Sequence, residues 1–280
     1  MFYLFPEQSV GKIDTVSTIA GLVQLLQKTK NEETRRKVAE ILGEIGKGDS
    51  ETIAGLVQLL QKTKNEETRR KVAEILGEIG KGDSEAIAGL VQLLQKARNE
   101  NTRREVARSL ENIGNGDSEA IAGLVQLLQK TRNENTRREV ARSLENIGNG
   151  DSEAIAGLVQ LLQKTRNENT RREVARSLEN IGNGDSEAIA GLVQLLQDTS
   201  NKETHSQVAE SLRKIGNGSS EAIAALVELF QSSQEEVNNW KLGASFGFVC
   251  IGSRSAISAL EQLIPSDILE IIFAELAGIL

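Results

Sequence analysis

Apolar residues recur in two alternating stripes along most of the chain. In residues 117–150 the first stripe follows the spacing i, i+3, i+4 and i+7 and comprises Ile121, Leu124, Val125 and Leu128. The second stripe follows a polar run and comprises Thr136, Val140, Ala141, Leu144 and Ile147. Spacings of three and four residues place side chains on one face of a helix. Each segment of this length therefore predicts two amphipathic helices in succession.

This segment is one copy of a 34-residue repeat. Residues 151–184 repeat 117–150 without change, and residues 83–116 differ only at Ala97, where the other two copies have threonine. Self-similarity at such a period indicates a repeat architecture. We expect seven repeats, at 15–48, 49–82, 83–116, 117–150, 151–184, 185–218 and 219–252. We interpret residues 1–14 as an N-terminal cap, and residues 253–280 as a partial eighth repeat with an apolar C-terminal capping helix.

Polar residues and glycines mark the ends of the two helices in each repeat. Asp117 or Ser118 can cap the first helix and Asn133 the second, because their side chains accept hydrogen bonds from the first turn. Gly148 follows the last apolar position, where we expect it to end the second helix in the left-handed conformation. One pair of helices cannot enclose its own apolar stripes, so each pair must pack against the next. The sequence therefore predicts an all-α solenoid.

The repeat also resembles a known family. Tetratricopeptide repeats share its period, but residues 117–150 contain none of the Trp, Tyr, Phe or Pro residues that those repeats need. The pattern resembles the HEAT-like repeats of the phycobilisome-lyase type. It is carried by Asp117, Ala120, Ile121, Leu124, Leu127, Leu128, Arg137, Ala141, Leu144, Ile147 and Gly148. The resemblance implies a right-handed α–α superhelix of the HEAT or armadillo kind.

The repeat is also similar to arrays found downstream of NACHT-type ATPase modules in cyanobacterial signalling or defence proteins. The chain has no GxxxxGK motif followed by Ser or Thr, so no ATPase activity carries over.

Composition and charge narrow the functional classes. Hydrophobic residues make up 39% of the chain and charged residues 26%, which argues against both disorder and a membrane protein. The net charge of −7 disfavours general attraction to nucleic acid. A single cysteine, Cys250, excludes an internal disulfide and is typical of a reducing, cytoplasmic compartment. With one cysteine and one histidine we expect no metal site and no cofactor.

Charged residues on the second helices form the candidate binding surface. Such helices usually line the concave side of a solenoid, where their outward positions recur about every 10 Å. The candidate residues are Arg104, Glu105, Arg108, Asn112, Arg138, Glu139, Arg142, Asn146, Arg172, Glu173, Arg176 and Asn180. Such a ladder could hold an extended peptide with acidic side chains or a nucleic acid backbone. In the alternative interpretation the charges are solvated pairs within each helix, because Lys37 and Glu40 reverse the signs of Glu105 and Arg108 together.

The two ends of the chain offer apolar contacts. Phe2, Tyr3, Leu4 and Phe5 could cover the first repeat. Residues 266–280 are more apolar than any second helix within the repeats. They predict either a plain cap or a contact surface, for a partner or for a second copy in a homodimer. Candidate apolar contacts are Trp240, Phe246, Ile272 and Phe273. Trp240 and Phe246 indicate either adaptation to the C-terminal helix or a ligand pocket.

The sequence places no catalytic group. His205 replaces an arginine of the other copies, and Cys250 has no histidine or acidic partner set beside it by the repeat pattern. Our first hypothesis is a non-enzymatic scaffold that binds a protein or peptide on the ladder or at the apolar C-terminal end. The second is an enzyme or accessory related to bilin lyases or to HEAT-like proteins acting on nucleic acid. The third is an idealised or recently duplicated repeat protein without a partner.

Overall fold

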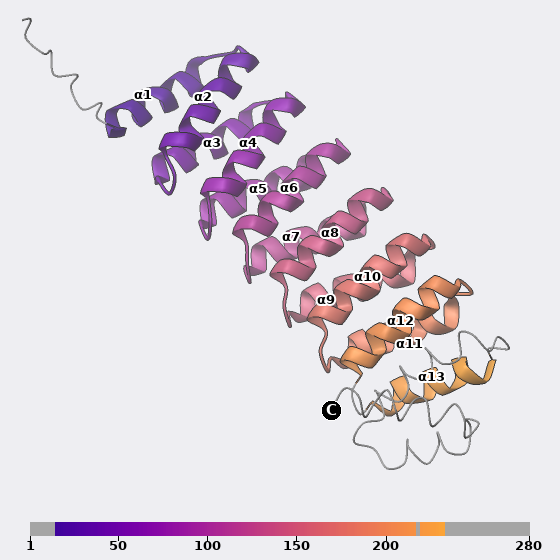
Figure 1. Ribbon diagram of the computed structural model, residues 1–280. Helices are drawn as coiled ribbons and strands as arrows, with labels where there is room; N and C mark the ends of the chain where they lie inside the picture. Colours follow the sequence, from indigo (N-terminus) through magenta and orange to yellow (C-terminus); the bar gives the residue numbers. More distant parts are fainter. Residues whose placement is uncertain (1–14, 217–218, 233–280) are drawn as a thin grey trace, which may run out of the picture. The chain divides into compact units, whose positions relative to one another are not determined.

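The computed structural model describes residues 15–216 and 219–232, with side chains as far as residue 226. Within these residues the chain forms thirteen α-helices and no strands. Contacts along the chain divide it after Ile113 into two compact units. Within each unit, consecutive helices form pairs, and each pair consists of an odd-numbered helix followed by an even-numbered one (Figure 1).

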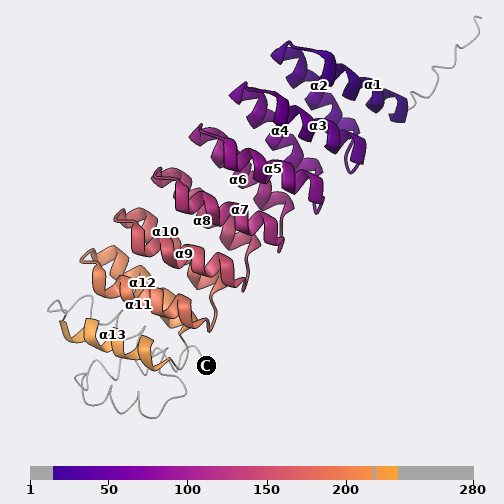
Figure 2. The same cartoon turned by 180° about the vertical axis from the view of Figure 1, so that it is seen from behind.

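The first unit contains three helix pairs. Its helices are α1 (Thr15–Lys28), α2 (Glu32–Ile45), α3 (Ser50–Lys62), α4 (Glu66–Ile79), α5 (Ser84–Lys96) and α6 (Glu100–Ile113). Helices α1, α3 and α5 pack in sequence as one layer, and α2, α4 and α6 as another. The two helices of each pair also contact each other across the layers, as the second view shows (Figure 2).

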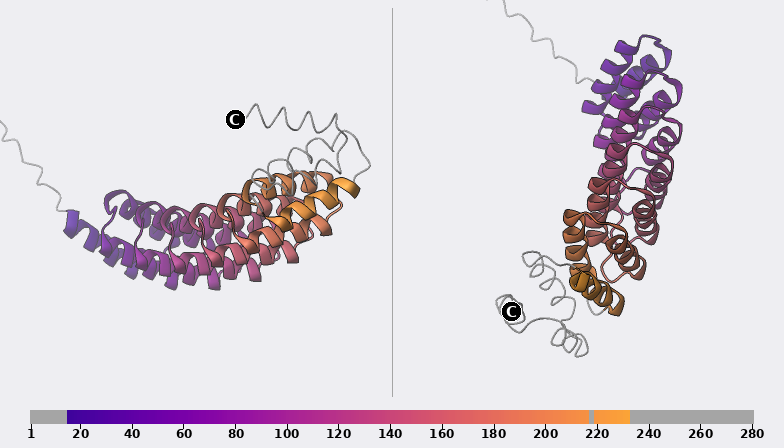
Figure 3. Two further views of the ribbon diagram at one scale, coloured as in Figure 1. Left: turned by 90° about the horizontal axis from the view of Figure 1, so that it is seen from below. Right: turned by 90° about the vertical axis from the view of Figure 1, so that its right-hand side faces the viewer.

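The second unit is built from helix pairs in the same way. Its helices are α7 (Ser118–Lys130), α8 (Glu134–Ile147), α9 (Ser152–Lys164), α10 (Glu168–Ile181), α11 (Ser186–Asp198), α12 (Lys202–Ile215) and α13 (Ser220–Ser232). Helices α7, α9, α11 and α13 form one layer, and α8, α10 and α12 the other (Figure 3). The prediction of a helical solenoid built from helix pairs is therefore confirmed.

The core contains the residues of the two sequence stripes. Ile121, Leu124, Val125 and Leu128 are all buried on α7, and Val140, Ala141, Leu144 and Ile147 are all buried on α8. Thr136, the first residue of the second stripe, is also completely buried. Burial of these Leu, Ile and Val side chains supplies the main driving force for stacking, at about 1.5–3 kcal/mol for each side chain.

The predicted N-terminal caps are also confirmed. Asp117 Oδ1 accepts a hydrogen bond of 2.9 Å from the backbone N–H of Ala120. Asn133 Oδ1 accepts one of 3.0 Å from the backbone N–H of Thr136. Ser118 is the first residue of α7, so the cap of that helix is Asp117.

The expectation that Gly148 is left-handed is wrong. Gly148 ends α8 with φ −107°, and the left-handed glycine is Gly150, with φ 71°. Gly148 is instead required by crowding, since an added Cβ would lie 2.7 Å from Ala154 Cβ and 2.8 Å from the Leu144 carbonyl oxygen. The left-handed turn lets the Gly150 N–H donate to the Ile181 carbonyl at 3.2 Å, which satisfies a carbonyl at the end of α10.

Several predictions concern residues outside the described part of the chain. These are the N-terminal cap at 1–14, the segment 253–280, and the contacts proposed for Trp240, Phe246, Ile272 and Phe273. Cys250 lies there as well. The division into seven repeats at the stated boundaries stays a prediction. None of the described helices is long and apolar enough to span a bilayer.

Candidate functional site

The twelve ladder residues lie on three even-numbered helices, α6, α8 and α10. In each helix the first two of the four residues are half-buried and the last two are exposed. Helices α8 and α10 pack side by side in the second unit, whereas α6 belongs to the first. We call the outward side of α8 and α10 the rung surface, and define it by Arg138, Glu139, Arg142, Asn146, Arg172, Glu173, Arg176 and Asn180.

On each of the three helices, an asparagine side chain accepts a hydrogen bond from the first candidate arginine. Arg138 Nη2 donates to Asn135 Oδ1 at 2.6 Å, and Arg172 Nη2 donates to Asn169 Oδ1 at 2.5 Å. In the first unit, Arg104 donates to Asn101 in the same way at 2.6 Å. Because each asparagine lies three residues earlier on the same helix, the guanidinium groups are fixed along the helix surface. Less side-chain entropy then remains to be lost on binding a ligand.

Ion pairs connect neighbouring even-numbered helices. Arg142 on α8 lies 3.2 Å from Glu173 on α10. The same two repeat positions pair in the first unit with reversed charges, since Lys71 on α4 lies 3.7 Å from Glu40 on α2. The alternative interpretation, that the charges form ion pairs within one helix, applies to Lys71 and Glu74, which lie 3.3 Å apart on α4. It leaves out the ion pairs between helices. The two charges are also coupled between neighbouring repeats, which is a second reason for them to change sign together.

The arginines project further into solvent than the carboxylates that neutralise them. The side chains of Arg142 and Arg176 are 61% and 58% exposed, whereas that of Glu173 is 18% exposed. Glu145 on α8 is half-buried and accepts hydrogen bonds from Ser177 at 3.0 Å and from Asn180 at 2.5 Å. The outermost charge on the rung surface is therefore positive, although the repeat as a whole is neutral.

A second polar ladder lies at the start of the even-numbered helices, and sequence reasoning missed it. Glu134 Oε2 accepts hydrogen bonds from Thr165 at 3.2 Å and Thr170 at 2.7 Å, both in the next repeat. Its other oxygen pairs with Arg137 at 2.5 Å, and Arg137 Nε donates to the Thr131 carbonyl at 3.1 Å. We call this arrangement the clasp. It also occurs around Glu32, Glu66 and Glu168.

The clasp is a structural device. Thr165 and Thr170 are almost completely buried, and the carboxylate of the preceding repeat accepts a hydrogen bond from each hydroxyl. The signal that could have found it was the recurrence of Glu134, Thr165 and Thr170 at separations of 31 and 36 residues, which lie on either side of the repeat length. In the repeat that has Ala97 at the position of Thr165, Glu66 accepts a hydrogen bond of 2.7 Å from Thr102, which occupies the position of Thr170.

Acid should weaken the clasp. Burial raises the pKa of Glu168, but hydrogen bonds from Thr204 and Thr199 and the charge of Arg171 outweigh it, so the pKa lies below its ordinary value. The stabilisation is therefore complete above the pKa of the unfolded chain, about 4.3, and is lost as the pH falls through the lowered folded-state pKa. We expect Glu168→Gln to lose less stability than the parent between about pH 6 and about pH 3, as measured by urea unfolding. Equal losses would contradict this assignment.

His205 takes the place of the clasp arginine in α12. Its Nε2 lies 2.6 Å from the Thr199 carbonyl oxygen, the contact that Arg137 and Arg171 make elsewhere through Nε. The histidine is thus half-buried in a structural position.

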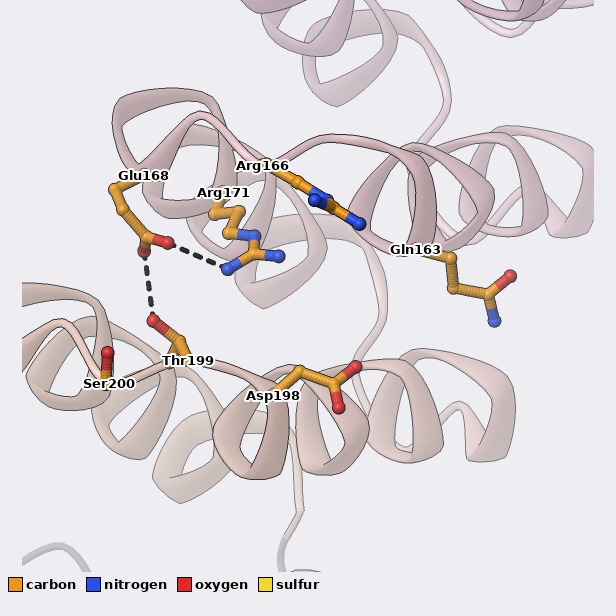
Figure 4. Close-up of a pocket in the computed structure, with 7 residues that line it drawn as sticks. All are labelled: Gln163, Arg166, Glu168, Arg171, Asp198, Thr199 and Ser200. Carbon is orange, nitrogen blue, oxygen red and sulfur yellow. Dashed lines mark hydrogen bonds and ion pairs between the residues drawn. The ribbon is translucent and has the colours of Figure 1, made fainter.

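A pocket of about 500 Å³ opens where the α9–α10 and α11–α12 connections meet. Figure 4 shows its lining residues, which are Gln163, Arg166, Glu168, Arg171, Asp198, Thr199 and Ser200. It is lined by Asp198 and Ser200, which replace Lys164 and Arg166 of the preceding repeat. Two of its charged groups, Glu168 and Arg171, already pair with each other at 2.7 Å. Among the described residues, no group of three or more His, Cys, Asp or Glu side chains could hold a metal ion.

Comparison with known proteins identifies the repeat type. A family model described as "HEAT repeats" matches the chain at residues 19–111, 87–179 and 155–243. No curated protein matches the chain.

Solved structures also match the chain, among them the following two. One, from "Computational Design of Self-Assembling Cyclic Protein Homooligomers", has 13% identity and a TM-score of 0.18, and the match covers 93% of this chain and 87% of that one. The other is a de novo designed 16-helix transmembrane nanopore, with 14% identity, a TM-score of 0.19, and coverage of 88% and 67%. Overlaps with TM-scores this low support no structural or functional conclusion.

Proposed function

Because this chain belongs to the HEAT repeat family, we propose that it is a non-enzymatic scaffold that holds an extended acidic peptide of a partner protein on the rung surface. HEAT repeats generally mediate protein interactions. The observation that carries the proposal is the outward position of Arg142 and Arg176 beyond the recessed carboxylate of Glu173. A ligand approaching α8 and α10 meets guanidinium groups first, and these pair well with carboxylates.

The spacing of the rungs favours a peptide over nucleic acid. Packed helices lie 8–10 Å apart. A peptide in the extended polyproline II conformation advances about 3.1 Å per residue with three residues per turn, so every third side chain faces a new helix of the rung surface. Double-stranded DNA carries one charge per about 1.7 Å of its axis. Phosphates at that density would also face Glu139 and Glu173, and the chain's net charge of −7 adds to the repulsion.

The proposal is tested with a fluorescein-labelled peptide of Glu-Gly-Ser repeats. We expect the double variant Arg142→Glu and Arg176→Glu to weaken binding about tenfold or more, since it replaces two attractive contacts by repulsive ones. Fluorescence anisotropy at low and high salt measures the change. The matched control is Lys130→Glu with Lys164→Glu, which changes the net charge equally on α7 and α9 and should leave binding nearly unaltered. Equal weakening by both doubles would refute a site on the rung surface.

The finer relationships stay proposals. Descent from phycobilisome-lyase-type repeats would be supported by retention of a bilin on the full chain, and an association with NACHT-type ATPase modules by binding to such a module. A short DNA duplex that competes with the acidic peptide at low salt would favour the nucleic-acid alternative. The contact proposed for the C-terminal end, the homodimer and a cytoplasmic location likewise stay proposals. A chain without a partner would bind none of these probes.

A further inference from the structure

The first repeat exposes a face that the later repeats bury. Of the described residues, the large apolar side chains that are exposed all belong to α1 and α2, and three of them, Leu25, Ile41 and Ile45, are 44%, 43% and 39% exposed. Their counterparts in the second repeat, Leu59, Ile75 and Ile79, are 3%, 3% and 7% exposed. We call the surface formed by Leu25, Ile41 and Ile45 the open face.

Other features show that the open face retains the chemistry of an internal interface. At Gly55, Gly89, Gly157 and Gly191, a valine of the preceding repeat packs on the glycine, as Val23 does on Gly55 with both methyls 3.0 Å from an added Cβ. At Gly21 an added Cβ meets no atom within 4 Å. The outward face of the first repeat is thus apolar, as a face between two stacked repeats is.

The polar edge of the open face is built for a carboxylate. Thr63 and Thr68 donate to Glu32 of the preceding repeat at 3.1 and 2.8 Å. Their counterparts are Thr29 and Thr34, and the Thr34 hydroxyl donates to Asn31 of its own helix cap at 3.2 Å. The open face therefore presents an apolar patch next to hydroxyls that bind a carboxylate elsewhere in the chain.

We propose that the chain's own residues 1–14 dock on the open face through Phe2, Tyr3, Leu4 and Phe5. The segment leads directly into α1, and its aromatic residues are the only ones before Phe230. Nine residues separate Phe5 from Thr15 and span up to about 30 Å when extended, whereas α1 is about 21 Å long. The aromatic residues therefore reach any point along α1. The segment also carries a carboxylate, Glu7.

Docking in this way removes apolar surface from water on both partners. Phe and Tyr carry the largest apolar areas of any side chains near the N-terminus, and the first six repeats contain no Phe, Trp or Tyr. A second copy is the competing occupant, because exposed apolar faces also drive self-association. The two differ in one respect that can be measured: coverage by the chain's own segment is independent of protein concentration.

Thiol labelling tests the proposal on the full chain. In a Cys250→Ser background, Leu25→Cys places a thiol on the open face, and Gln24→Cys places one on the neighbouring exposed position of the same helix. We expect replacement of Phe2, Tyr3, Leu4 and Phe5 by serine to raise the labelling rate at position 25 about tenfold and to leave position 24 unchanged. Circular dichroism confirms that the serine variant keeps its helices.

Two results would overturn the proposal. If the serine variant labels at the parent rate, residues 2–5 do not cover Leu25. If the parent rate falls as protein concentration rises, a second copy covers the face. Neither result bears on peptide binding at Arg142 and Arg176, so the two proposals fail independently.

Discussion

Leu158→Ala should lower the free energy of unfolding by about 2–5 kcal/mol. Leu158 is completely buried on α9, which packs between α7 and α11 and against α10. Truncation removes apolar contacts and leaves a cavity that fixed neighbouring helices fill only in part. Urea unfolding followed by circular dichroism measures the loss.

The control for Leu158→Ala lies two residues further along the same helix. Gln160 is exposed, and its side chain accepts only a long hydrogen bond of 3.4 Å from Gln129. Gln160→Ala should change the stability by less than about 0.5 kcal/mol. If the two substitutions cost the same, the α7–α9–α11 layer is not the packed core described here.

Gly157→Val should cost about 2–3 kcal/mol, although valine favours helix more than glycine does. An added Cβ at Gly157 would lie 2.9 and 3.0 Å from the two methyls of Val125 on α7. Because valine is confined to few χ1 rotamers, it cannot turn both methyls away, and the helices must separate.

Gly21→Val is the matched control. It changes the same repeat position in α1, where an added Cβ meets nothing within 4 Å. In the variant whose Phe2, Tyr3, Leu4 and Phe5 are replaced by serine, so that docking of residues 1–14 does not contribute, we expect it to leave the stability unchanged or to raise it slightly, again by urea unfolding. A loss at Gly21 as large as at Gly157 would show that helix flexibility, and not crowding between repeats, explains the glycines.

The helices and their N-terminal caps were predictable because they depend on local pattern. The spacing of Leu124, Val125 and Leu128 determines a helix face, and Asn133 precedes the next helix within hydrogen-bond reach. The conformation of Gly148 was not predictable in this way. It depends on Ala154, which approaches only after the next helix has folded back against the turn.

The candidate site was predictable in residue type but not in geometry. Counting charges in the repeat gives neutrality, and only the structure shows that Arg142 projects while Glu173 is recessed. The clasp was missed because Glu134 and Thr170 lie 36 residues apart, and no local rule pairs them. In an exact repeat, however, side chains about one period apart become neighbours, so such pairs can be sought directly.

The central claim is that the rung surface recognises carboxylates at its own spacing. The most direct measurement compares two labelled peptides of identical composition in fluorescence anisotropy, one with glutamate at every third position and one with all its glutamates clustered. We predict that the regularly spaced peptide binds the full chain several-fold more tightly and that Arg142→Glu with Arg176→Glu abolishes the difference. Equal affinity of the two peptides would contradict the claim.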